Sequence, residues 1–174
     1  VAAAMEELYA PFVRNGKPII VMDPASSEMT KYAANALLST KISFINELAN
    51  LCELLGADID NVRRGMCSDS RIDYQFLYPG LGFGGSCFPK DIQALTRICD
   101  SVGYPGWLLK AVKQVNDYQK LSLQRKITAH FGDDLTGRQF AVWGISFKPR
   151  TDDIRESPAL GLIADLLALG AKVN

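Results

Sequence analysis

The pattern of apolar and polar positions along the chain predicts a mainly helical protein. Apolar residues recur at helical spacing in stretches bounded by capping residues, glycine or proline. The longest such stretch would begin at a cap on Ser26 or Ser27 and end before Gly56. Its apolar positions cover so much of the helix that we expect burial on several sides, between domains or against a partner subunit. The expected helices cover residues 2–13, 26–55, 58–64, 89–99, 107–131 and 158–169.

Strands are expected in short segments, and the first helix is expected to end at Asn15-Gly16. The β-branched run Ile19–Met22 and the apolar run Phe140–Ile145 favour strands, and another begins at Lys172-Val173. The order strand, loop, helix, strand after residue 140 is typical of a parallel α/β unit. The predicted fold class is therefore a mainly α central dimerisation domain with a long helix, followed by the beginning of an α/β Rossmann-like domain.

Composition and charge narrow the classes of partner. Hydrophobic residues make up 48% of the sequence, and 19 basic side chains balance 19 acidic ones. This balance predicts neither a nucleic-acid groove nor a polybasic membrane surface. No apolar run approaches the roughly 20 residues that span a bilayer, and no secretion signal opens the chain. The start at Val1 and the stop at Asn174, where a strand begins, suggest a piece of a longer protein.

The cysteines do not form a metal-binding pattern. Cys52, Cys67, Cys87 and Cys99 include no Cys-x-x-Cys pair, and His130 is the single histidine of the sequence. A zinc site is therefore not expected. Spacing alone leaves disulfides open, but four thiols in a chain with a good core favour a reducing compartment, and we expect a cytoplasmic protein.

A glycine-rich segment from Pro79 to Asp91 contains the most distinctive chemistry. Its glycines would let the backbone approach a ligand closely. Cys87 lies just before Pro89, at the start of a predicted helix, where the helix dipole and free N–H groups favour the thiolate. Lys90 adds positive charge, and Asp91 lies one turn further on, within reach of a group bonded to the sulfur. The alternative is a buried structural cysteine beside a turn.

Lys31 and Asn35 lie four residues apart on the long helix and can converge on one atom. An ammonium and an amide N–H₂ are suitable donors for a developing oxyanion. The alternative is a solvated lysine beside a surface asparagine. In the loop 147–157, Lys148 and Arg155 follow a buried strand and could hold phosphate oxygens, unless this is an ordinary charged loop.

Three stretches resemble the UDP-glucose/GDP-mannose dehydrogenase family: Ser27–Glu47, Arg71–Asp91 and Val142–Ser157. The most specific motif is Gly-Phe-Gly-Gly-Ser-Cys-Phe-Pro-Lys-Asp, residues 82–91. The resemblance implies domain boundaries at 1–25 for the end of an N-terminal dinucleotide-binding domain, 26–131 for the central helical domain with its cysteine loop, and 132–174 for the start of a UDP-binding domain. The family's Gly-x-Gly-x-x-Gly fingerprint is missing: Gly80, Gly82 and Gly85 have its spacing, but no buried strand precedes them.

The resemblance also implies roles for individual residues. Cys87 matches the catalytic nucleophile, Lys31 and Asn35 match the oxyanion-stabilising pair, and Asp91 matches the aspartate that assists proton transfer or orients water. Lys90 and Arg155 match positions that contact NAD. The positions that match substrate contacts are Phe76, Leu77, Tyr78, Pro79, Gly80 and Gly84 in the sugar-nucleotide pocket, Lys148 at a phosphate, and Arg71, which in some members reaches the sugar of the neighbouring subunit.

The implied activity is NAD-dependent, four-electron oxidation of a UDP-sugar, with UDP-glucose favoured by the Phe-Leu-Tyr-Pro-Gly and Ser-Cys-Phe-Pro-Lys-Asp phrases. We expect a homodimer through the long helix and no bound metal. Relatives acting on GDP-mannose or UDP-N-acetylmannosamine remain an alternative. A cysteine-dependent acyl-transfer enzyme is disfavoured, because His130 lies far from Cys87 in the sequence. A third possibility is that the chain alone is an inactive dimerisation module.

Overall fold

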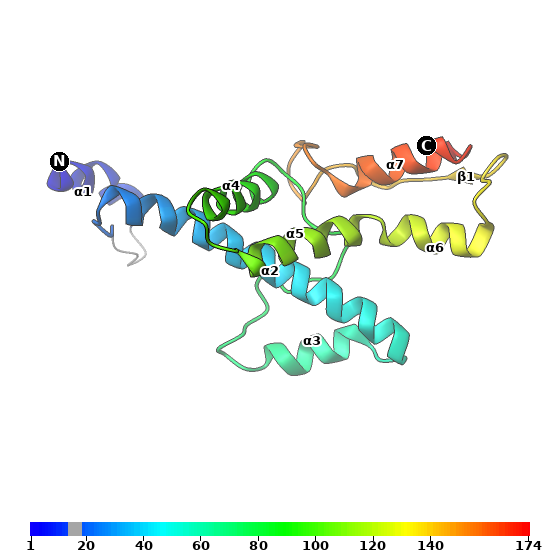
Figure 1. The fold of residues 1–174 in the computed structure, drawn as a ribbon, viewed down its shortest axis with the longest axis horizontal. Coiled ribbons are helices and arrows are strands. Elements are labelled where there is room, and N and C mark those ends of the chain that lie inside the picture. The colour runs from blue at the N-terminus through cyan, green and yellow to red at the C-terminus, as the bar shows by residue number, and fades with distance from the viewer. Residues whose placement is uncertain (14–18) are drawn as a thin grey trace.

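A computed structural model describes residues 1–13 and 19–174, and it is mainly helical as predicted (Figure 1). The expected helix end at Asn15-Gly16 lies outside the described residues. Its elements, in chain order, are α1 (Ala2–Tyr9), the 3-10 helix η1 (Ala10–Phe12), α2 (Pro24–Leu55), α3 (Ile59–Cys67), α4 (Phe88–Ser101), α5 (Trp107–Lys120), α6 (Ser122–Phe131), β1 (Gln139–Phe140), α7 (Pro158–Ala168) and β2 (Lys172–Val173).

Helix α2, 32 residues long, is the central element of the fold and contacts α3, α4 and α5. Figure 1 shows α4 and α5 along one side of it and α3 along the other. The helix begins earlier than the expected cap at Ser26 or Ser27, because Asp23 accepts the Ser26 N–H at 3.0 Å and Pro24 suits the first turn. It ends as predicted at Gly56, which has a φ of 70°.

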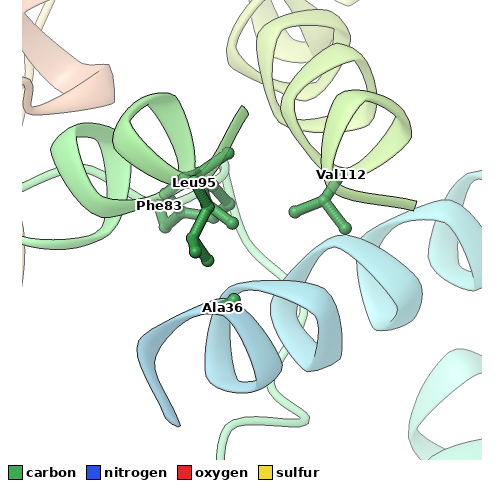
Figure 2. Close-up of a cluster of buried hydrophobic side chains, with 5 residues drawn as sticks. Ala36, Phe83, Leu95 and Val112 are labelled. Carbon is green, nitrogen blue, oxygen red and sulfur yellow. The ribbon is translucent and has the colours of Figure 1, made fainter. Parts of the chain in front are cut away.

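Two apolar clusters on α2 fix the segment between α3 and α4. Ala36 packs with Phe83, Leu95 and Val112 from the loop, α4 and α5 (Figure 2). Towards α3, Ile45 packs with Cys67 and Leu77. Leu77, just before the glycine-rich segment, and Phe83 within it are thus anchored in the core, while residues 78–82 between them are exposed or half-buried.

The C-terminal part forms the predicted β-loop-α-β unit. Strands β1 and β2 pair in parallel, with Gln139 opposite Lys172 and Phe140 opposite Val173. Helix α7 contributes Leu162 and Leu166 to a core with Leu135 and Ala171. β1 is shorter than the expected strand 140–145 because its partner offers few residues; after Phe140 one further bond is formed, from Val142 N–H to the Asn174 carbonyl at 2.9 Å.

Three other expectations differ from the structure. Ile19–Met22 is not a strand, since no strand within the described residues pairs with it, and Ile20 is 70% exposed. The first helix changes to 3-10 geometry at Ala10, because Pro11 cannot donate an α-helical hydrogen bond. The helix expected over 107–131 is divided at Leu121, whose N–H bonds to the Tyr118 carbonyl at 3.3 Å. No glycine or proline marks this break in the sequence.

Candidate functional site

Cys87 stands at the start of α4 with its side chain exposed. Its carbonyl accepts the Asp91 N–H at 2.8 Å, which closes the first helical turn. The Ser86 hydroxyl lies 3.8 Å from the sulfur. The prediction of a cysteine at a helix start is therefore confirmed, and the reading of Cys87 as a buried structural cysteine is wrong.

Beside Cys87, the fold brings together the three other residues expected to take part in chemistry. The Asp91 carboxylate is fully buried, and its Oδ2 accepts hydrogen bonds from Lys31 Nζ and from Asn35 Nδ2, the latter at 2.6 Å. Lys31 and Asn35 therefore converge on one atom, as their spacing predicts. Lys90 Nζ lies 3.9 Å from the other carboxylate oxygen, Oδ1.

These contacts set the charge states at the site. Burial raises the pKa of Asp91, but hydrogen bonds from Lys31 and Asn35 and the charges of Lys31 and Lys90 outweigh it, so the pKa is lowered. The hydrogen bond to Asp91 raises the pKa of Lys31, with smaller electrostatic contributions from Asp91 and Cys87. At neutral pH the site therefore holds an ionised carboxylate and a protonated amine next to the thiol. Asp91 Oδ1 is buried without a hydrogen-bond partner among the described residues.

Buried amide side chains hold the glycine-rich segment in place. Asn46 Oδ1 accepts the Gly80 N–H at 2.7 Å, and Gln119 Nε2 donates to the Gly80 carbonyl at 2.7 Å. Asn116 bonds both to the N–H of Phe83, at 2.7 Å, and to its carbonyl, at 3.1 Å. Sequence reasoning missed these three amides. The sequence did place these polar side chains at core-facing positions of two helices. Because a buried amide without a hydrogen-bond partner is costly, such positions indicate a polar partner nearby.

Gly84 and Gly85, which precede the cysteine, allow a close approach of the loop 147–157. A Cβ on Gly84 would collide with the Glu156 carbonyl, and one on Gly85 would lie 2.7 Å from the Phe147 ring. The Gly85 N–H also donates to the Arg155 carbonyl at 2.8 Å. The cysteine loop and the loop 147–157 are consequently packed closely against each other, and the contact of Gly84 with substrate stays a prediction.

The residues expected to line the sugar-nucleotide pocket divide into two groups. The Leu77 side chain is in the core, so only its backbone is near the surface. Phe76 and Tyr78 are exposed, and the Phe76 ring lies 6.1 Å from that of Phe88, next to Cys87. Pro79 is half-buried, and Gly80 is exposed with open space at its Cα. The segment 76–80 thus presents two exposed aromatic rings, of which that of Phe76 lies beside Phe88, while the Gly80 backbone is bound by amide side chains.

Lys90 and Arg155, the expected NAD contacts, line one cavity of about 560 Å³ together with Lys113 and Lys120. Arg155 binds both oxygens of Asp153, at 2.9 and 2.7 Å, which lowers the pKa of Asp153 to about 2.

Lys148 and Arg71 lie outside that cavity. Lys148 is exposed beside the Phe147 ring, and Arg71 is exposed and paired with Asp69 at 2.6 Å. The hydrogen bonds from Arg71 lower the pKa of Asp69. Both cations are therefore at the surface, where a ligand or another subunit could reach them.

Within residues 1–13 and 19–174, no cluster of histidine, cysteine and acidic side chains has the composition of a metal site. The four thiols are all free. None of the helices in these two ranges combines the length and apolarity needed to cross a membrane.

Comparison with known proteins gives a consistent result along the chain. Residues 25–118 match the central domain, and residues 141–174 the UDP binding domain, of the UDP-glucose/GDP-mannose dehydrogenase family. A UDP-glucose 6-dehydrogenase of Pseudomonas aeruginosa is 50% identical over 170 residues, covering 98% of this chain and 38% of the relative. One of Bacillus subtilis is 49% identical, covering 99% of this chain and 37% of its own length.

Solved structures show the same relationship. A UDP-glucose dehydrogenase of Pyrobaculum islandicum matches with a TM-score of 0.90 at 39% identity, covering 99% of this chain and 39% of that one. A UDP-N-acetylmannosamine dehydrogenase of Pyrococcus horikoshii matches with a TM-score of 0.82 at 25% identity, covering 99% of this chain and 40% of that one. The chain thus spans about two fifths of the length of these relatives.

Proposed function

We propose that this chain, which belongs to the UDP-glucose/GDP-mannose dehydrogenase family, is the part of a UDP-glucose 6-dehydrogenase that carries the catalytic cysteine. The observation that carries the proposal is the exposed Cys87 thiol beside the buried Asp91 carboxylate, which Lys31 and Asn35 both bind. Because the chain covers 38% of its relative from Pseudomonas aeruginosa, the activity is proposed for an enzyme of the relatives' full length that contains these residues, called here the full-length enzyme.

In the proposed reaction, C6 of the sugar changes from a primary alcohol to a carboxylate. The oxidation takes place in two steps of two electrons each. NAD⁺ would supply a hydride acceptor for each step, so two NAD⁺ are used in all. Lys90 and Arg155 fit such a cofactor, because their cations line one cavity next to the cysteine loop and can pair with phosphate oxygens. Metal chemistry has no part in the proposal.

Cys87 acts between the two oxidations. Its thiolate adds to the C6 aldehyde and forms a thiohemiacetal, and loss of the second hydride converts that adduct into a thioester. Water then attacks the thioester carbonyl, which releases the carboxylate and restores the thiol. The exposed position of Cys87 at a helix start supports this role, since an exposed sulfur is accessible to the aldehyde of a bound substrate.

Lys31 and Asn35 stabilise the oxyanions of the thiohemiacetal and of the thioester hydrolysis. Both already place their donors at one point, the Asp91 Oδ2 atom. Donors held in advance by a buried carboxylate need little reorganisation when negative charge develops beside them. Asp91 keeps Lys31 protonated and orients it towards the reacting group.

The relatives favour UDP-glucose over other nucleotide sugars. The relatives at 50% and 49% identity are named UDP-glucose 6-dehydrogenases, whereas the named UDP-N-acetylmannosamine dehydrogenase is 25% identical. The match of residues 141–174 to a UDP binding domain further favours a uridine nucleotide over GDP-mannose.

The test is NADH formation by the full-length enzyme with UDP-glucose, GDP-mannose or UDP-N-acetylmannosamine. We expect UDP-glucose to have the highest kcat/KM and to yield two NADH per UDP-glucuronate. Cys87→Ser should abolish turnover or stop it at a covalent ester, detectable by mass spectrometry, while the control Cys99→Ser keeps normal rates. A preference for another nucleotide sugar would reject the substrate, and full activity of Cys87→Ser would reject the nucleophile.

A further inference from the structure

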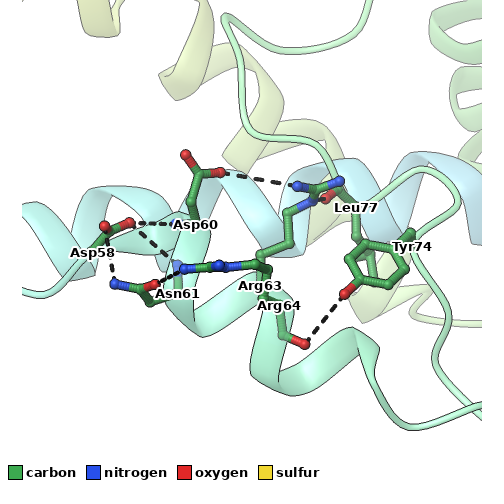
Figure 3. A network of polar contacts seen from close by, with 7 residues as sticks. All are labelled: Asp58, Asp60, Asn61, Arg63, Arg64, Tyr74 and Leu77. Carbon is green, nitrogen blue, oxygen red and sulfur yellow. Dashed lines mark hydrogen bonds and ion pairs between the residues drawn. The ribbon is translucent and has the colours of Figure 1, made fainter.

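Arg63 of α3 contacts several residues of the segment that precedes the glycine-rich loop (Figure 3). Its Nε donates to the Leu77 carbonyl at 2.6 Å, and its guanidinium lies 4.0 Å from the centre of the Tyr78 ring. The Tyr74 ring is on another side of the same group, at 5.2 Å, and Asp60 is 4.0 Å away. The Arg63 side chain is only 15% exposed, so these contacts are largely shielded from water.

The segment held by Arg63 needs such support. Phe76 has a φ of 65°, a left-handed conformation that costs a bulky residue energy and persists only when neighbours enforce it. The Leu77 side chain anchors one side of the segment in the core, while its carbonyl points towards α3 and is bound by Arg63. Arg63 therefore fixes the backbone of the residue whose side chain the apolar core holds.

The same guanidinium also sets the position of an exposed aromatic ring. Tyr78 is 57% exposed, yet its ring is stacked on a largely buried cation. A planar guanidinium can stack on the ring and donate to a carbonyl at once, whereas a lysine ammonium has neither the plane nor the fixed fork. An arginine thus meets both geometric demands at this position.

We propose that Arg63 is a positioning residue for substrate binding, which fixes segment 76–80 and the Tyr78 ring in the arrangement that receives the nucleotide sugar. This inference rests on the proposed function, because that function assigns the segment to the substrate. Arg63 itself has no role in bond making: it lies behind the segment and is separated from the surface by Leu77 and Tyr78.

The experiment compares Arg63→Lys with Arg64→Lys in the full-length enzyme. Arg64, the next residue on α3, is exposed and bonds through its side chain to Asn61, so its replacement is a matched control. Arg63→Lys should raise KM for UDP-glucose about tenfold, because a loosened segment weakens substrate binding. KM for NAD⁺ and kcat should stay within about twofold of the values of the unsubstituted enzyme, because the reacting groups are unchanged. Arg64→Lys should leave all three constants unchanged.

Hydrogen exchange read by mass spectrometry separates this inference from the proposed function. In Arg63→Lys, peptides covering residues 74–80 should exchange at least several times faster, while peptides of α2 keep their protection and show that the fold is intact. Faster exchange with an unchanged KM for UDP-glucose would overturn the positioning role, as would unchanged exchange. An unsubstituted enzyme that does not oxidise UDP-glucose would reject the proposed function, while the exchange data would still report whether Arg63 holds the segment.

Discussion

Cys87 differs from the other cysteines in its exposure. Cys52 and Cys67 are buried and Cys99 is partly buried, whereas Cys87 is exposed at a helix start near the cations of Lys31 and Arg155. We therefore expect Cys87 to react first with iodoacetamide at neutral pH, because access and nearby positive charge both favour attack by the thiolate. Peptide mass spectrometry after brief labelling measures this order. Faster labelling of Cys99 than of Cys87 would contradict the assignment of the nucleophile.

Lys31 should matter more to catalysis than to binding. Donors aimed at a developing oxyanion act mainly in the transition state, and losing one lowers the rate by about 10²–10³. In the full-length enzyme, Lys31→Ala should therefore lower kcat by that factor, with little change in KM for UDP-glucose. Lys110→Ala, which removes a lysine from a surface ion pair with Asp100, is the control and should keep the normal kcat. A normal kcat in Lys31→Ala would return Lys31 to a structural role.

The ionisation of Asp91 makes the stability of the fold depend on pH in the acid range. Its pKa is lowered in the folded state, so its ionised form stabilises the fold above the unfolded pKa of about 3.9, and this stabilisation is lost as pH falls through the folded pKa. Asp91→Asn should lower the free energy of unfolding by about 1–3 kcal/mol at pH 7, because hydrogen bonds to a buried charge are weakened.

Urea unfolding of this chain between pH 3 and 7 tests the effect of Asp91→Asn. The difference from the unsubstituted chain should shrink below pH 4, because the carboxylate of the unfolded chain protonates before the native one, whose pKa is lowered. Asp69→Asn serves as the control: its carboxylate is also paired, with Arg71, but at the surface, so a much smaller effect is expected. An equal difference at every pH would show that Asp91 does not titrate with unfolding.

At the scale of elements, the contact between the cysteine loop and the loop 147–157 depends on Gly85. Its φ is 80°, and a Cβ there would meet the Phe147 ring at 2.7 Å. Gly137 has nearly the same φ, 81°, but open space around its Cα. Gly85→Ala should therefore lower the free energy of unfolding by about 1–3 kcal/mol more than Gly137→Ala, because overpacking is added to the cost of a left-handed backbone.

Thermal unfolding of the two glycine variants measures that difference, and the double variant Gly85→Ala/Phe147→Ala identifies its cause. Removing the ring should restore part of the loss caused by Gly85→Ala, since the added methyl group then has room. Equal destabilisation by Gly85→Ala and Gly137→Ala would mean that the two loops are not held by this close approach.

At the scale of the whole molecule, α2 has more apolar surface than this chain covers. Leu37, Phe44 and Leu51 recur every seven residues along the helix and are 63%, 47% and 49% exposed. Such a seam fits a two-fold contact with the same helix of a second copy. We expect the chain to be a dimer at micromolar concentration, and Phe44→Asp to dissociate it, because a carboxylate would be buried without a partner.

Sedimentation velocity tests the dimer. Val102→Asp is the matched control, since it places the same charge on a 72% exposed apolar residue at the end of α4, away from α2. It should leave the sedimentation coefficient unchanged. A monomeric unsubstituted chain, or equal effects of the two substitutions, would remove α2 as the interface.

The sequence by itself determined the local features of the protein. Helical periodicity and the turn residue Gly56 marked α2, and the spacing of Lys31 and Asn35 predicted their convergence. The placement of Cys87 before Pro89 marked the start of α4. These predictions succeeded because capping, periodicity and i,i+4 spacing act over a few residues and need no knowledge of distant neighbours.

Only the tertiary structure decided which distant groups satisfy one another. Asp91 Oδ2 is the atom on which Lys31 and Asn35 converge, across about 60 residues of sequence, and the loop 147–157 fills the space beside Gly84 and Gly85. Likewise Ile19–Met22 is β-branched but has no strand beside it within the described residues, and Arg63 has its role only because Leu77 and Tyr78 fold back onto α3. Strand pairing, buried charge and backbone contacts depend on partners remote in the chain, and a linear pattern does not specify those partners.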